Sequence, residues 1–194
     1  MKYFHAPSFV ASAISYQIPN VPNYNQYEAG APVGCEGVSL YQALQAKGDV
    51  DHYSLHTFLT MLPKAATPDQ GFVGSPFVAD AKTYTAIYAA PLANFGKQFG
   101  QVVNLPEASL ATIEAEVTAG NPVVAYVTEH FAAPRFGQWS FGRVVNNNHA
   151  VTVAGFNRLT RKLYVSDPID GQYWISASKF AAAYNVRHMA VVVR

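Results

Sequence analysis

Hydrophobic positions at helical spacing dominate the first third of the chain. Within residues 34–48, Val38, Tyr41 and Leu44 recur three apart, and this period predicts a helix with one apolar face. A second, shorter helix is expected over residues 54–62, with its leucine and phenylalanine side chains again on one face. The N-terminal part of the fold is therefore predicted to be mainly helical.

Later in the chain the pattern changes to continuous apolar runs that are typical of strands. A helix is first predicted over residues 106–119, with Pro106 at its first position and Gly120 after its last. The run at residues 122–127 then predicts a buried strand. The remaining predicted elements are strands at 150–156, 162–166 and 189–193, a helix at 177–184, and an extended lead-in over 3–18 that alternates like a strand at 14–18.

Two segments are rich in aromatic side chains but have no regular period. Glycine and proline punctuate residues 64–100, and we expect ordered loops there with one short helix, laid over the core. Residues 129–148 form another predicted loop, whose aromatic side chains either line a substrate cleft or pack against their own loop (Phe131, Phe136, Trp139 and Phe141). Helices come first and mainly antiparallel strands follow, so the sequence predicts one α+β domain over residues 1–194.

Composition narrows the classes of function. Half of the 194 residues are hydrophobic and 13% are charged, which excludes disorder for most of the length. The formal net charge is +1 with no basic run, so nothing supports nucleic-acid binding. No apolar run approaches the roughly 18 residues that span a bilayer. The composition leaves the oligomeric state open.

The chain has one cysteine, Cys35, where a loop rich in glycine and proline becomes the first helix. Free backbone N–H groups and the positive end of the helix dipole favour an anion at this position. We therefore expect a lowered pKa for the Cys35 thiol, which is a usual way to make a cysteine nucleophilic. Taken alone, a single cysteine is more often a small buried apolar residue.

The strands at 150–156 and 162–166 are joined by a short polar connection and predict an antiparallel hairpin. If its centre lies near Arg158, His149 and Asp167 lie opposite each other, each nine residues from that point. A slip by two residues would leave the pair diagonal and within reach, whereas a slip by one would separate the two side chains onto different faces. A carboxylate beside His149 would orient the ring and stabilise its protonated form.

A third polar residue completes this set. Gln26 lies nine residues before Cys35 in the irregular loop, and its amide N–H₂ and the Cys35 backbone N–H would together form an oxyanion hole. Cysteine, histidine and an acid are the three groups that thiol-based acyl transfer requires. Each also has a plainer interpretation, because His149 can be a structural histidine at a strand edge and Asp167 can begin a turn before Pro168.

The segments that carry these residues resemble the papain-like cysteine peptidases. More narrowly, they are similar to the bacterial branch related to the bacteriocin-processing (double-glycine leader) peptidases, and the resemblance covers roughly residues 17–193. Nothing in the chain resembles the transporter to which those peptidases are usually fused, so leader-peptide cleavage is not implied. The resemblance rests on Val21-Pro22, Gln26, Gly34-Cys35-Glu36-Gly37-Val38-Ser39-Leu40, Gly120-Asn121-Pro122-Val123-Val124, Asn148-His149-Ala150-Val151, Gly155-Phe156 and Val165-Ser166-Asp167-Pro168.

This resemblance implies a papain-like fold, a peptide or protein substrate and no cofactor. It implies Cys35 as nucleophile, His149 as general base and then acid, Asp167 as the orienting acid and Gln26 as the oxyanion donor. We therefore expect thiol-dependent hydrolysis of a peptide or related amide bond. The alternatives are acyl transfer to an amine or thiol at the same site, and a cell-surface or peptide-binding module that keeps the fold without turnover.

Two further expectations concern location and metal binding. The bacterial resemblance favours a secreted or cell-surface location, although residues 1–15 make a poor signal peptide. His52 and His56 are four apart and lie near two aspartates, but they lack a third clear metal ligand. A solvated helix face is the plainer interpretation of that pair.

Overall fold

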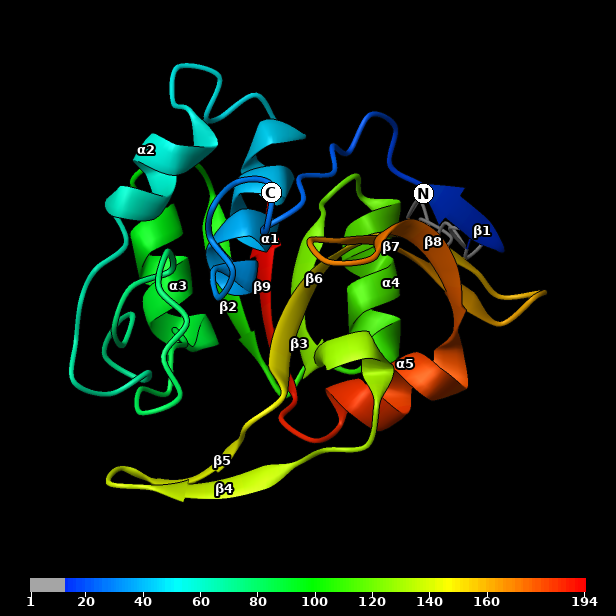
Figure 1. Ribbon diagram of the computed structural model, residues 1–194. Coiled ribbons are helices and arrows are strands. Elements are labelled where there is room, and N and C mark those ends of the chain that lie inside the picture. Colours follow the sequence, from blue (N-terminus) through cyan, green and yellow to red (C-terminus); the bar gives the residue numbers. More distant parts are fainter. Residues whose placement is uncertain (1–12) are drawn as a thin grey trace, which may run out of the picture.

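The computed structural model describes residues 13–194, and the helix α1 (Cys35–Gln45) is packed into the middle of the fold (Figure 1). Ten of its residues are buried, including the predicted apolar stripe. Gly37 allows the short helix α2 (Leu55–Thr60) to approach closely, because a Cβ at this glycine would lie 2.5 Å from Leu59 Cδ2. The predicted first and second helices are confirmed.

A stripe of polar side chains on α1 faces the sheet. Gln42 donates from Nε2 to Thr152 Oγ1 at 3.1 Å, and Ser39 Oγ donates to the Ala150 carbonyl at 3.0 Å. Both acceptors belong to the strand β6 (Asn148–Asn157). These buried hydrogen bonds fix the position of α1 along β6, so they also fix the helix N-terminus relative to the first residues of that strand.

The strands form a seven-stranded antiparallel sheet in the order β2-β9-β3-β6-β7-β8, with β1 paired to the far end of β6. The central strands β3 and β6 are almost entirely buried. Their bounds and those of the other strands are β1 (Ser15–Gln17), β2 (Val102–Pro106), β3 (Val123–Thr128), β7 (Lys162–Asp167), β8 (Gly171–Ser176) and β9 (Met189–Val193).

Two hydrophobic cores lie on opposite faces of this sheet. In β3, Val124 and Tyr126 pack with the helices α1, α2 and α3 (Ala89–Gly96). Val123 and Ala125 belong to the core beneath α4 (Leu110–Thr118) and α5 (Ala177–Tyr184). Figure 1 shows α1 to α3 gathered on one side of the sheet and α4 and α5 on the other. Because alternate strand residues point to opposite faces, a continuous apolar run is what a sheet covered on both sides requires.

Several later predictions are confirmed. The strand β9 and the helix α5 (Ala177–Tyr184) have the predicted bounds, and α3 is the one short helix expected within residues 64–100. The strand-like alternation near residue 16 forms β1. Residues 3–12 of the predicted lead-in lie outside the described part of the chain.

The predicted start of the helix at Pro106 is wrong. Pro106 ends the edge strand β2, which pairs with β9, and α4 (Leu110–Thr118) begins only after Ser109. The Ser109 side chain accepts a hydrogen bond from the Thr112 N–H, which is the usual N-terminal helix cap. Proline is tolerated in β2 because an edge strand leaves one row of N–H groups unpaired.

Besides β2, two segments contain strands that the sequence pattern did not predict. The loop expected over residues 129–148 contains a 3₁₀ turn, η1 (Glu129–Phe131), and a two-stranded ribbon of β4 (Phe136–Trp139) and β5 (Gly142–Val145). This ribbon extends away from the main sheet in Figure 1. The strand β8 follows the turn after Asp167 and pairs along all of β7. No helix within residues 13–194 is long and apolar enough to cross a membrane.

Candidate active site

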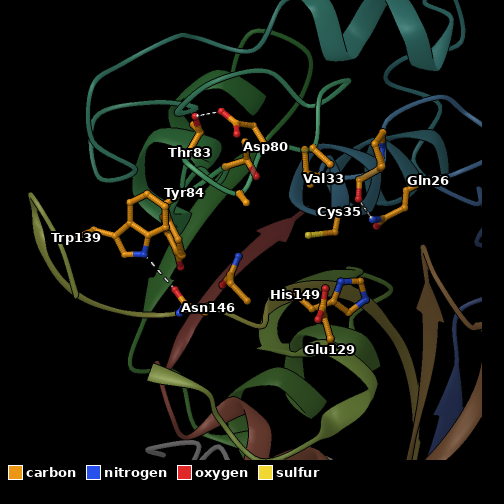
Figure 2. A pocket seen from close by; sticks show the side chains of 15 residues that line it. Gln26, Val33, Cys35, Asp80, Thr83, Tyr84, Glu129, Trp139, Asn146 and His149 are labelled. Atoms are coloured by element: carbon orange, nitrogen blue, oxygen red, sulfur yellow. Dashed lines mark hydrogen bonds between the residues drawn. The ribbon is translucent and has the colours of Figure 1, made fainter. Parts of the chain in front are cut away.

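A pocket of about 460 Å³ lies at the N-terminus of α1, where the first residues of β6 pass beside the helix. Figure 2 shows Gln26, Cys35 and His149 among its lining residues, with Gln26 beside Cys35. The structure thus brings together three of the four residues that the sequence singled out. The fourth, Asp167, lies at the end of β7 and contacts the His149 ring.

The hairpin that carries His149 and Asp167 has a register different from the predicted one. Near its turn Asn157 pairs with Lys162, whereas beyond an irregularity at residues 153–155 Thr152 pairs with Ser166. Relative to the predicted register, the offset is therefore three residues near the turn and two residues beyond the irregularity. A β-bulge, which inserts one extra residue into one strand, has this effect.

The bulge decides whether the two side chains share a face. An odd offset would place them on opposite faces of the sheet, and the change to an offset of two restores the common face. His149 and Asp167 are consequently diagonal neighbours, and His149 Nε2 lies 2.8 Å from Asp167 Oδ1. Their predicted meeting is confirmed, whereas direct opposition is wrong. Gly155 permits the close packing here, since a Cβ would lie 3.0 Å from the Tyr16 carbonyl oxygen.

Asp167 is fully buried but well supplied with hydrogen-bond donors. Its Oδ1 accepts from the Ile169 N–H at 2.8 Å, and its Oδ2 accepts from the Tyr173 hydroxyl at 2.9 Å. Burial raises the pKa of this carboxyl, but the hydrogen bonds and the charge of His149 outweigh burial, so the pKa lies below its usual value. An ionised carboxylate only accepts hydrogen bonds, so His149 Nε2 carries a hydrogen, and in the neutral ring Nδ1 is the acceptor.

Cys35 occupies the first position of α1 as predicted, but the expected lowered pKa is wrong for this arrangement. The residue is 6% exposed, and its Sγ donates to Glu36 Oε2 at 3.3 Å. Burial, the Glu36 charge and this hydrogen bond raise the pKa of the Cys35 thiol well above its usual value. Within residues 13–194 we find no hydrogen bond from Cys35 to His149, and in Figure 2 the sulfur is directed to one side of the His149 ring.

Gln26 reaches the pocket because its loop is attached to the end of β7. The Gln26 N–H donates to the Pro168 carbonyl at 2.8 Å, and Asn23 Nδ2 donates to the Asp167 carbonyl at 2.9 Å. The Gln26 side chain is buried and donates from Nε2 to the Pro32 carbonyl at 2.6 Å, while its Oε1 has no partner. The amide therefore has a second N–H in addition to the one bonded to Pro32.

Sequence reasoning missed three polar residues next to the cysteine. Glu36 is fully buried and accepts from Asn148 Nδ2 at 2.8 Å, and Asn148 Oδ1 accepts from Arg187 Nη1 at 2.7 Å. The available signal was the polar spacing three apart of Glu36, Ser39 and Gln42 in an otherwise apolar helix. Such spacing places a carboxylate on the face that the helix buries.

The aromatic residues of the 129–148 segment were expected either to line a cleft or to pack against their own loop. One of them lines the pocket, and others pack elsewhere. Trp139 lines the pocket, and its Nε1 donates to Asn146 Oδ1 at 3.1 Å (Figure 2). Phe131 is instead buried in the core beside Phe180, and Phe136 is about half exposed beneath Arg143. In the described part of the chain no three histidine, cysteine or acidic side chains are placed to hold a metal ion.

A match to a family model shows which protein family this chain belongs to. The model of a family described as the Peptidase_C39 like family matches residues 18–191, which is most of the chain. The chain belongs to this family. A search of curated proteins finds no match.

The fold of this C39-like chain is also found in a solved structure. A putative C39-like peptidase from Bacillus anthracis superposes with a TM-score of 0.76 at 22% identity, covering 93% of this chain and 97% of the other. The α+β, papain-like fold is thereby confirmed, as is the resemblance to C39-type peptidases. At 22% identity the likeness concerns the fold alone.

Two other structures are more distant from this C39-like chain. One is a double glycine motif protease from an AMS/PCAT transporter in complex with the leader peptide, with 15% identity, a TM-score of 0.47 and coverage of 90% and 91% of the two chains. The other is Xylellain, a cysteine protease from Xylella fastidiosa, with 12% identity, a TM-score of 0.49 and coverage of 95% and 87%. TM-scores below 0.5 are too low to support a detailed comparison of sites.

Proposed function

We propose that this C39-like chain is a cysteine peptidase that hydrolyses a peptide or related amide bond through Cys35, His149 and Asp167. The observation that carries this proposal is that one pocket is lined both by a cysteine at a helix N-terminus and by a histidine hydrogen-bonded to a buried carboxylate. These are the groups that thiol-based acyl transfer uses.

In the proposed reaction, Cys35 passes its proton to His149 Nδ1, the ring nitrogen that does not contact Asp167. This requires Sγ to turn about its single side-chain torsion toward His149, and such catalytic hydrogen bonds often form only when substrate is bound. The thiolate attacks the carbonyl carbon, a C–S bond forms, and His149 returns the proton to the leaving amine as the C–N bond breaks. Water, deprotonated by His149, then cleaves the thioester and restores the thiol.

The negative oxygen of each tetrahedral intermediate needs hydrogen-bond donors. The Cys35 N–H, in the first turn of α1, is one of the groups that has no acceptor within the helix. The second N–H of the Gln26 amide is the other proposed donor. Gln26→Ala should therefore lower kcat by about 10²- to 10³-fold. The control is Asn25→Ala, which removes a neighbouring amide outside this pocket; equal losses in both variants would contradict the role of Gln26.

A peptide-library cleavage profile tests the function itself. The purified protein should cleave a subset of the library, with Cys35→Ala as the blank and His149→Ala at least about 10³-fold slower. Unchanged cleavage in Cys35→Ala would sink the proposal. Products that carry an added amine in place of a new carboxylate would instead identify acyl transfer, and tight peptide binding without any cleavage would identify a binding module.

A further inference from the structure

Glu36 is a buried carboxylate that the proposed reaction does not use. It follows Cys35 in the first turn of α1, where side chains of surface helices usually meet water, but none of its surface is exposed. Its two oxygens have separate partners, because Oε2 accepts from Cys35 Sγ at 3.3 Å and Oε1 accepts from Asn148 Nδ2 at 2.8 Å. The thiol thus interacts with this carboxylate, and Cys35 lines the pocket together with His149.

The surroundings of Glu36 hold it in place. Asn148, whose Nδ2 occupies Glu36 Oε1, is itself fixed by Arg187 Nη1 on its Oδ1. Arg187 also donates to the Tyr84 hydroxyl at 3.2 Å, and its guanidinium lies 4.1 Å from the centre of the Tyr88 ring. The arginine therefore acts on Glu36 through an amide rather than by a direct ion pair. A side chain anchored at Oε1 keeps its Oε2 directed at the sulfur.

We propose that Glu36 is a positioning residue that holds the Cys35 thiol as a hydrogen-bond donor in the free protein, so that the nucleophile forms only after Sγ turns from Glu36 to His149. This inference rests on the proposed function, because it assigns a resting state to the same nucleophile. Glu36 Oε2 and His149 Nδ1 are the two acceptors proposed for the one S–H group. In the free protein the S–H group donates to Glu36 Oε2.

Electrostatics favours a protonated thiol in this position. A thiolate next to an ionised Glu36 would place two negative charges about one hydrogen bond apart, and both groups are buried. The titratable and charged groups around Cys35 come from several elements. They are Tyr27 in the Gln26 loop, Asp80 and Tyr84 in the 64–100 segment, Tyr126 on β3, Glu129 in η1, His149 on β6 and Arg187 before β9. Arg187 and a protonated His149 both lower the pKa of Glu36. Burial outweighs them, so the pKa of Glu36 is raised.

Alkylation of the only cysteine measures this arrangement directly. Iodoacetamide reacts with the thiolate, forming an S–C bond and releasing iodide, and intact mass counts one addition at Cys35. Glu36→Gln keeps the shape, and Asn148 Nδ2 requires the new amide to present its oxygen, so the Gln N–H₂ would face Sγ as a donor. We expect at least about tenfold faster alkylation near neutral pH, which corresponds to one unit of thiol pKa, and a rate profile shifted to lower pH.

The matched control removes a partly exposed carboxylate that lines the pocket of Cys35. Glu129→Gln should change the alkylation rate by about twofold or less, since exposed charges are screened by solvent. Circular dichroism checks that each variant is folded. Superimposed pH profiles for folded Glu36→Gln and the unmodified protein would overturn the proposal, as would an equal acceleration in Glu129→Gln.

The S–H stretching band gives a test that needs no folded variant. Because the chain has one cysteine, its Raman S–H band belongs to Cys35 alone. We expect the band to be present near pH 6 and at a lower frequency than that of a thiol in an apolar solvent, since a bond to a carboxylate weakens S–H. A missing band would mean that thiolate and imidazolium are already paired, and an unshifted band would mean that Glu36 does not accept; either result overturns the proposal.

These measurements separate the two proposals. Alkylation and the S–H band require no peptide substrate, so they report on Glu36 even if the chain cleaves nothing. A shifted alkylation profile without any cleavage would support the resting position and defeat the proposed peptidase function. Cleavage that depends on Cys35, together with an unshifted profile, would leave the peptidase and remove the role of Glu36.

Discussion

Two buried carboxylates lie on either side of the reactive pair, and their pKa values are shifted in opposite directions. Asp167, behind His149, has a lowered pKa, while Glu36, beside Cys35, has a raised one. Neither has any exposed surface. The difference lies in their donors, because Asp167 accepts from an imidazole, a phenol and backbone N–H groups, whereas Glu36 accepts from an amide and a thiol.

Burial alone therefore does not decide whether the pKa of a carboxyl group is raised or lowered. Desolvation raises the pKa of both groups, and only a sufficient set of donors reverses it. The two carboxylates therefore have different roles in the proposed mechanism. The Asp167 side keeps His149 oriented and ready to accept a proton, and the Glu36 side keeps the thiol protonated.

The largest expected effect comes from removing the charge on the His149 side. Asp167→Asn should lower kcat by about 10⁴-fold, because the histidine loses the partner that fixes its tautomer. Steady-state kinetics on a peptide identified in the library measures the loss, and the folded state is checked by thermal unfolding. A loss smaller than about tenfold would show that Asp167 is a structural turn residue.

A second prediction concerns the opposite signs of the two pKa shifts. Asp167 has a folded pKa below its unfolded value, so its stabilisation is present above about pH 4 and is lost as pH falls through the folded pKa. Asp167→Asn should therefore lower the free energy of unfolding by about 3 kcal/mol or more at about pH 6. The loss should be smaller at about pH 3. Urea unfolding at both pH values measures the difference.

Glu36 should show the reverse trend. Its folded pKa lies above its unfolded value, so the protein loses stability from about pH 4 upward until the folded pKa is passed. The stability of Glu36→Gln relative to the unmodified protein should therefore improve as pH rises through this window. Parallel pH trends for the two variants would refute the contrast between the two carboxylates.

The smallest expected effect tests a single donor. Tyr173→Phe removes the hydroxyl that donates to Asp167 Oδ2 and should cost about 1 kcal/mol of unfolding free energy. It should also move the acid-unfolding midpoint to higher pH, because the pKa of Asp167 rises when a donor is lost. The control Tyr164→Phe removes a hydroxyl that donates to Gln172 at 3.3 Å near the surface. Identical shifts in both variants would contradict the donor argument.

Much of the fold followed from local patterns. The helix behind Cys35, the strand β9 and the helix α5 were predictable because their apolar patterns are regular and are not interrupted by proline. The ribbon at residues 136–145 was not, because it is held by pairing with itself outside the main sheet and carries no long apolar run. The helix start at Pro106 failed because pairing with β9 outweighed the local preference of proline for a first helical turn.

The sequence by itself determined that His149 and Asp167 lie near one another, because the hairpin brings them together in any register that keeps both on one face. It also determined that Cys35 begins a helix. Only the tertiary structure decided how they meet and what state the thiol is in. The bulge at residues 153–155 lies where β6 packs closely against β1, and the burial of Glu36 involves Asn148 of β6, which Arg187 fixes in place. Desolvation and donor count arise from segments distant in the chain, so no local pattern encodes them.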